Sequence, residues 1–352
     1  MIKVFQYTSL FILLISCSAT QKPADRLLRL SNDTIEIGLL PDVGGGLVRV
    51  SLVGQPNILQ SDSTFWNEPA EKRPSLDPNQ PYKAYNGHIN WLNPQSEWWV
   101  KQNLVPDLKA KQSAWPPDPY LTLASYKITS GKKGEITMVS PESPYTHVQF
   151  TKTYRIAGNK VYLTTSARNI SKDTVSWGLW FNTRMNGWDH VFIPADSASL
   201  VKCTWMNQSG EKLPVLIRQN GYFSYKALLP DSTKKTYKAK SFFFPAAAPM
   251  IAGFKANQWL IIRSDMIERS AIHPEQARIE LYVENSVSRK EDLQELEMQF
   301  AYEKIAPDSS ITASQIWEVL PGTGLASKVE LGKELMRILG VNNEQLEVNK
   351  EK

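Results

Sequence analysis

The strongest constraint on this sequence is an alternation of apolar and polar residues, which has a period of two from about Arg26 onward. Such alternation sends successive side chains to opposite faces of a strand. It predicts strands over residues 34–39, 47–53, 121–129, 135–139, 147–156, 160–169, 175–181, 259–263, 278–283, 293–302 and 310–319. Because no helical pattern separates them, the sequence predicts an all-β antiparallel sandwich or barrel.

One helix is predicted near the end of the chain. Ser327 and Glu330 have the spacing of a capping box, and Gly340 is a suitable stop. An apolar stripe between them should pack on the sandwich. We therefore expect one domain over residues 26–322, followed by a helix and a charged tail over residues 323–352.

Composition excludes several classes of protein. Hydrophobic residues make up 42% of the 352 residues, so the chain can bury a core. The net charge of +5 comes without a dense basic block, and we expect no nucleic-acid partner. Two cysteines cannot build a disulfide scaffold or a four-cysteine zinc site. Nucleotide, zinc-protease and serine-hydrolase motifs are absent, and we expect a monomer without cofactor or metal.

The N-terminal residues resemble a targeting signal. Lys3 precedes a short apolar run over residues 10–15, and Leu14-Ile15-Ser16-Cys17 resembles the lipobox of bacterial lipoproteins. This resemblance implies a signal peptide over residues 1–16, a lipid on Cys17 and a tether over residues 17–25. The protein would then be anchored to a membrane of the bacterial cell envelope. The alternative is an ordinary secretory signal with an incidental cysteine.

Tryptophan is concentrated in two stretches, and one of them lies in a Trp- and Pro-rich segment without predicted strands, residues 60–119. A loop of that length is usually functional. Sugars present C–H faces that stack on aromatic rings, and amides and carboxylates bind their hydroxyls. We therefore expect Trp91 and Trp98 to face a ligand. The polar side chains beside them are Asn86, His88, Asn90, Glu97 and Lys101.

Four stretches together resemble the galactose mutarotase-like, or aldose 1-epimerase-like, superfamily, and in particular an uncharacterised bacterial branch of it. They are the glycine turn of residues 40–46 with residues 54–59, the loop of residues 86–94 with Trp98, the paired strands of residues 150–183, and residues 294–297 with the turn at 305–310. The resemblance implies a β-supersandwich of antiparallel strands with a concave, aromatic-lined carbohydrate pocket.

The resemblance also implies catalytic roles. A mutarotase uses a carboxylate to take the proton from the anomeric hydroxyl and a histidine to protonate the ring oxygen. Glu295 and Glu297 lie two apart on a predicted strand, and either can be the base. The family's acid histidine is missing near Asn182, so His88 is the first replacement and His190 the second.

Three further residues are candidates for substrate binding. Trp180 can contact ligand or fill the core, and Arg184 with Asp189 can clamp hydroxyls or an acidic sugar, or form a surface salt bridge. Two functions remain open: an aldose 1-epimerase-like isomerase, and a lipoprotein that binds glycan without turning it over. A structural role in the cell envelope is a third.

Overall fold

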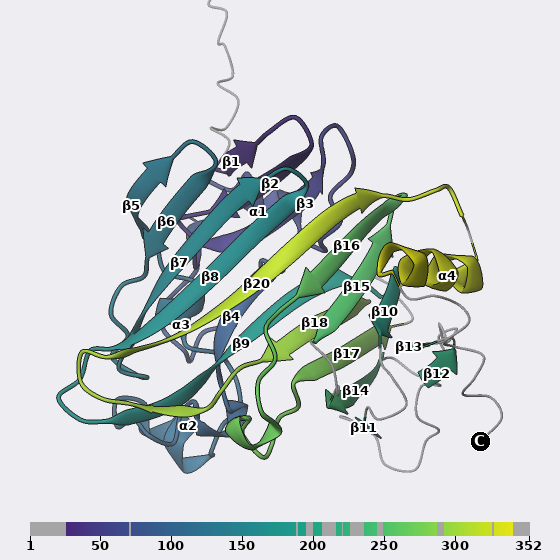
Figure 1. Ribbon diagram of the computed structural model, residues 1–352. Helices are drawn as coiled ribbons and strands as arrows, with labels where there is room; N and C mark the ends of the chain where they lie inside the picture. Colours follow the sequence, from purple (N-terminus) through teal and green to yellow (C-terminus); the bar gives the residue numbers. More distant parts are fainter. Residues whose placement is uncertain are drawn as a thin grey trace, which may run out of the picture.

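The computed structural model describes residues 26–69, 72–187, 189–194, 200–205, 216–219, 221–225, 236–244, 249–286, 292–325 and 327–340. Within this part of the chain, antiparallel strands form two large sheets that pack face to face (Figure 1). The predicted all-β class with a short C-terminal helix is confirmed. None of the described helices is long and apolar enough to cross a membrane.

The first sheet carries the candidate site. Its described strands, in spatial order, are β1 (Leu28–Ser31), β2 (Ile35–Leu40), β3 (Gly46–Leu52), β4 (His88–Asn93), β9 (Val175–Asn186), β18 (Leu293–Gln299), β17 (Ile279–Ser286), β14 (Thr236–Phe244) and β11 (Leu200–Trp205). The short β19 (Glu303–Ile305) also pairs with β9.

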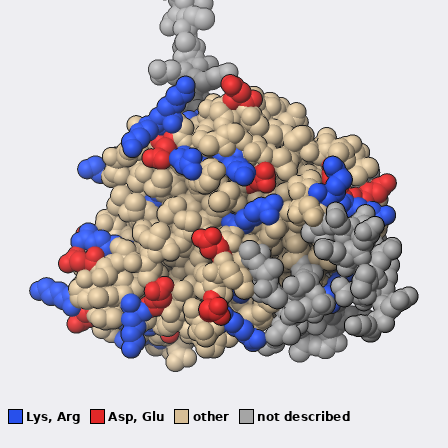
Figure 2. Space-filling view, viewed as in Figure 1, with Lys and Arg blue, Asp and Glu red and all other residues tan. Residues whose placement is uncertain are grey.

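The second sheet supports the first from behind. Its described strands, in spatial order, are β12 (Leu216–Gln219), β13 (Tyr222–Tyr225), β10 (His190–Pro194), β15 (Met250–Lys255), β16 (Gln258–Arg263), β20 (Ser310–Pro321), β8 (Lys160–Asn169), β7 (Val148–Ala157), β6 (Glu135–Val139) and β5 (Lys127–Lys132). Burial alternates strictly along β7 and β20, as the period-two pattern predicts. On the face shown in Figure 2, the charged side chains are scattered and do not form one large patch.

The C-terminal helix α4 (Lys328–Ile338) begins as predicted, since the Ser327 hydroxyl accepts from the backbone N–H of Glu330. It covers the outer face of the second sheet near β10 and β15 (Figure 1). Its buried Leu331 and Leu335 join a small apolar cluster with Trp259. Gly332 lies so close to the Tyr222 ring that a Cβ there would clash with it.

The prediction of a strand over residues 121–129 is wrong in its first half. Pro119 and Asp118 start a short helix, α3 (Pro119–Thr122), in which the Asp118 carboxylate accepts from the N–H of Tyr120. The other described helices in this region are α1 (Ser63–Trp66) and α2 (Pro106–Ala110), with a 3-10 turn at Gln95–Glu97.

The prediction of a loop around residues 86–94 is also wrong. Residues 88–93 form β4, which pairs with β9 inside the first sheet. Most of its residues are buried, on both faces of the strand, so the sequence shows no period-two signal there. This difference decides where His88 points.

Candidate functional site

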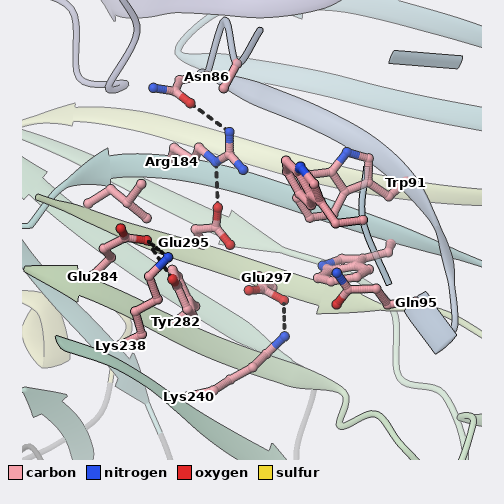
Figure 3. A pocket seen from close by; sticks show the side chains of 14 residues that line it. Asn86, Trp91, Gln95, Arg184, Lys238, Lys240, Tyr282, Glu284, Glu295 and Glu297 are labelled. Carbon is pink, nitrogen blue, oxygen red and sulfur yellow. Dashed lines mark hydrogen bonds and ion pairs between the residues drawn. The ribbon is translucent and has the colours of Figure 1, made fainter. Parts of the chain in front are cut away.

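A cavity of about 560 Å³ opens on the face of the first sheet that is turned away from the second sheet (Figure 3). It lies over strands β4, β9, β18, β17 and β14. The side chains that line it are Ala84, Asn86, Trp91, Gln95, Trp115, Trp180, Arg184, Lys238, Lys240, Tyr282, Glu284, Leu293, Glu295 and Glu297.

Alternation along β9 decides which side chains reach the cavity. Trp180 and Arg184 line it, and Asn182 lies between them on the same face of the strand. Phe181 and Met185, on the other face of β9, point into the core between the sheets. Most of the lining therefore stands on regular strands, which hold side chains more rigidly than loops do.

Strand register brings the predicted glutamates to this face. Glu297 lies directly opposite Asn182, and Glu295 lies directly opposite Arg184, where β18 pairs with β9. Both glutamates line the cavity, because residues two apart on a strand share a face. The sequence left open which of the two faces the pocket; in the structure both do.

Arg184 is held at one side of the cavity by two partners. Its Nε donates to Glu295 Oε1 at 2.6 Å, and its Nη1 donates to Asn86 Oδ1 at 2.7 Å (Figure 3). The guanidinium also lies 5.5 Å from the centre of the Trp91 ring, within cation–π range. Arg184 is thus a buried, ordered group of the cavity wall and not part of a surface salt bridge.

Lys240 lines the cavity from β14 and reaches Glu297 and Trp180. Its Nζ lies 2.6 Å from Glu280 Oε2, 3.0 Å from Glu297 Oε2 and 4.7 Å from the centre of the Trp180 ring. Burial opposes the charge on Lys240, but the two carboxylates outweigh it and raise the pKa of the ammonium. Lys240 therefore stays cationic at neutral pH.

The pKa of Glu297 lies far from its ordinary value. The side chain has no exposed surface, and burial raises its pKa well above the ordinary range, with Lys240 partly offsetting this and Glu280 and Glu295 adding to it. Its Oε1 has no hydrogen-bond partner among the described residues. A carboxyl with a raised pKa that lines a cavity is a candidate general acid or base.

Two other buried polar groups beside Glu297 lack partners within the described structure. They are the side-chain amide of Asn182, at both its nitrogen and its oxygen, and the indole N–H of Trp180. A buried polar atom without a hydrogen bond costs about 1–3 kcal/mol. Such groups are rare in native proteins, and a cluster of them in and directly beside the lining of a cavity indicates a site that binds a polar ligand.

The end of the cavity over β17 and β14 is polar. The Tyr282 hydroxyl donates to Glu284 Oε2 at 2.7 Å, and Lys238 Nζ lies 3.1 Å from the same oxygen. These groups offer both donors and acceptors to a ligand hydroxyl.

The opposite end is aromatic. Trp91 stands at 87° to both Trp180 and Trp115, with ring centres 4.7 and 6.4 Å away. Trp98, which the sequence placed at the ligand, lies behind this wall: it is buried, its indole N–H donates to the Leu92 carbonyl, and it does not line the cavity.

The structure corrects the prediction for His88. Its ring lies in the layer between the two sheets, 4.9 Å from Trp317 of the second sheet, with Nδ1 2.9 Å from Thr183 Oγ1. Burial, and then the nearby charge of Lys152, lower the pKa of His88 well below its usual value. His88 therefore faces away from Glu297 and cannot protonate a ligand in the cavity.

The other predicted residues lie outside the cavity. Glu97 pairs with Lys101 and accepts from the Tyr302 hydroxyl at the edge of the sheet. Asp189, whose pKa burial raises to about 6, accepts from the N–H of Asn186, and His190 stacks on Phe192 in the second sheet. These three do not converge with the glutamates, and Cys17 lies outside the described residues.

Sequence reasoning missed half of the cavity. Lys238, Lys240, Tyr282 and Glu284 line the cavity, and Glu280 pairs with Lys240, but none of these five was predicted as a site residue. A weak signal existed, because Lys238 and Lys240 would share one face of a strand, but no strand was predicted over residues 236–244. Nothing in the sequence, however, indicates that these faces meet. In the described part of the chain, no group of three or more His, Cys, Asp or Glu side chains is placed to hold a metal ion.

Comparisons with known proteins agree with this architecture. The family model of a domain of unknown function, DUF4380, matches residues 25–320. No curated protein has significant similarity to the sequence.

Solved structures share the fold at low sequence identity. A candidate aldose 1-epimerase from Klebsiella pneumoniae superposes with a TM-score of 0.55 at 13% identity, covering 83% of this chain and 78% of its own. A galactose mutarotase-like protein from Lactobacillus casei gives 0.52 at 9% identity, covering 84% and 100%. A candidate aldose 1-epimerase from Escherichia coli K12 gives 0.50 at 13% identity, covering 84% and 99%. The β-sandwich is therefore galactose mutarotase-like, as the sequence resemblance implied.

Proposed function

The chain belongs to the DUF4380 family, whose domain has no assigned function, and from this premise we propose that the cavity binds a carbohydrate. The observation that carries the proposal is a group of unpartnered polar atoms among the described residues: Trp180 and Glu297 line the cavity, and Asn182 lies directly opposite Glu297 on the neighbouring strand. Indole rings beside hydroxyl-binding amides and carboxylates suit a sugar, which has apolar C–H faces and a polar rim. The mutarotase-like fold of the relatives supports the same class of ligand.

The test is a screen of the full-length protein against a glycan array, followed by titration calorimetry with each free sugar that binds. We expect at least one sugar to bind, and Glu297→Gln to weaken its binding about tenfold or more, because the amide keeps the shape of the side chain but removes the carboxyl group. Glu303→Gln, on an exposed residue of β19, is the matched control and should change nothing. If no sugar binds, or if both variants behave alike, carbohydrate binding at this cavity is refuted.

A second candidate function is proton transfer on the bound sugar, in the manner of an aldose 1-epimerase. It is favoured by Glu297, whose pKa burial raises and whose carboxyl lines the cavity. Glu297 would take the proton of the anomeric hydroxyl, and the ring oxygen would need a proton from a group other than histidine, since no described histidine lines the cavity. Binding without turnover requires no such proton donor, and it is therefore the simpler of the two functions.

Polarimetry distinguishes the two functions. A catalyst accelerates the change of optical rotation of a sugar that binds, and Glu297→Gln abolishes the acceleration. Binding without acceleration at saturating protein leaves the isomerase function without support.

We propose further that the protein is held at a membrane of the cell envelope through a lipid on Cys17. The motif at residues 14–17 supports this, together with the polar residues that follow it. Metabolic labelling with a radioactive fatty acid should mark the wild-type protein and leave Cys17→Ala unlabelled. Equal labelling of the two would refute the anchor.

A further inference from the structure

The cavity is long for a single sugar ring. Its lining runs from Trp91 on β4 to Lys238 on β14, and these strands are four positions apart in the sheet. Neighbouring strands lie about 4.8 Å apart, so the lining extends about 19 Å across the sheet. Figure 3 shows the two ends separated by the side chains of Glu295 and Glu297.

Trp115 forms the rim at the aromatic end. It is 45% exposed, although the other lining tryptophans are almost fully buried. Its ring contacts Tyr82 edge-on at 5.1 Å between ring centres, and Trp91 in the same way. A large exposed apolar side chain beside a cavity indicates a contact surface.

The backbone around Trp115 is fixed by three side chains. Gln95 Nε2 donates to the Ala114 carbonyl at 2.6 Å, Ser113 Oγ donates to the carbonyl of Trp115 itself at 2.5 Å, and Trp99 Nε1 donates to the Pro116 carbonyl at 2.7 Å. Ordering the backbone in advance lowers the entropy lost on binding. The backbone that carries the exposed indole is therefore ordered before a ligand binds.

Charge at the cavity limits the class of ligand. Arg184, Lys238 and Lys240 line it, and each forms an ion pair with a glutamate. Lys240 has a second carboxylate partner in Glu297. A sugar carboxylate or phosphate would meet cations that are already neutralised, and it would lie beside three glutamates of the lining.

We propose that the ligand is an uncharged oligosaccharide, with one ring over the floor at Trp180 and Glu297 and a neighbouring ring stacked on Trp115. The inference rests on the proposed carbohydrate binding and adds chain length and charge to it. Trp115 is then the residue that selects oligosaccharides over single sugars.

The test uses the full-length protein and titration calorimetry. The probes are the mono-, di-, tri- and tetrasaccharides of gluco-, galacto- and manno-configured series, with oligogalacturonides as the acidic series. In the series that binds, we expect the affinity to rise about tenfold or more once a second ring is present, since a tenfold change corresponds to about 1.4 kcal/mol. Trp115→Ala should remove this gain, because it weakens binding of the longer chains more than that of the monosaccharide, while Trp115→Phe keeps most of the gain.

Leu104→Ala is the control, because Leu104 is 63% exposed and does not line the cavity. The inference is overturned if the Kd is the same for all chain lengths, if Trp115→Ala weakens every length equally, or if the acidic series binds more tightly. Monosaccharide binding without a gain from longer chains contradicts this inference alone. Failure of every sugar to bind contradicts carbohydrate binding as well.

Discussion

Lys240 and Glu297 form an ion pair of 3.0 Å although their strands, β14 and β18, are not neighbours in the sheet. The lysine reaches across β17 and also binds Glu280 on that intervening strand. All three side chains are buried. The pair therefore connects three strands at the floor of the cavity and makes the stability of the sheet depend on the residues of the site.

Removing the cation should destabilise the fold strongly. Lys240→Met leaves Glu280 and Glu297 buried without their cationic partner, and breaking a buried pair in this way costs about 3–5 kcal/mol. The free energy of unfolding, measured in urea, should fall by that amount. Lys238→Met is the matched control: its partner Glu284 lies at the cavity margin and the lysine side chain is 39% exposed, so the loss should stay below about 1 kcal/mol. An equal decrease in the free energy of unfolding of the two variants would show that the buried pair contributes no more to stability than the exposed one.

Glu297 should make stability fall as the pH rises. Its pKa is higher in the folded protein than the ordinary value of 4.5, so above about pH 4.5 the folded state keeps a proton that the unfolded state has lost. Stability therefore decreases with rising pH from that point up to the folded pKa. Glu297→Gln carries no proton to lose, and thermal melts from pH 4.5 to 8 should show the variant gaining stability relative to the wild type. Parallel curves would show that the pKa of Glu297 is the same in both states.

The sequence predicted the sheets better than the site, for a physical reason. Strands with one buried face, such as β7 and β20, alternate visibly, whereas β4 is buried on both faces and has no alternation to detect. Glu295 and Glu297 could be found because the resemblance to the mutarotase superfamily points to their strand and their spacing puts them on one face of it. Lys240 could not, because its contact with Glu297 depends on the order of strands 40 to 60 residues apart, which is set by the global topology.

His88 illustrates the same limit. The polar residues around it indicated a ligand-binding loop, but pairing of β4 with β9 turns its ring into the core. His88→Gln should therefore leave the Kd of any ligand of the cavity unchanged. It should lower the free energy of unfolding by about 1–3 kcal/mol through loss of its buried contacts with Thr183 and Trp317. A large change in Kd at unchanged stability would restore His88 to the binding site.

Lys152 should impose an opposite pH dependence to that of Glu297. The side chain is fully buried between the sheets, where its Nζ donates to the Gly44 carbonyl at 2.8 Å and lies 5.1 Å from the centre of the Tyr126 ring. Burial lowers its pKa from 10.5 to about 7. Between these two values the unfolded state binds a proton that the folded state does not, so stability rises with pH across this window, by up to about 1.4 kcal/mol per pH unit.

Urea unfolding at pH 7, 8 and 9 measures this slope. Lys152→Met should lose the rise, while its absolute stability also reflects the donor that the Gly44 carbonyl loses. The comparison therefore uses the slopes and not the free energies at one pH. Lys304→Met, at an exposed position of β19, should keep the wild-type slope. If the wild type and Lys152→Met have the same slope, Lys152 is protonated to the same extent in the folded and unfolded states, and its burial carries no pH-dependent cost.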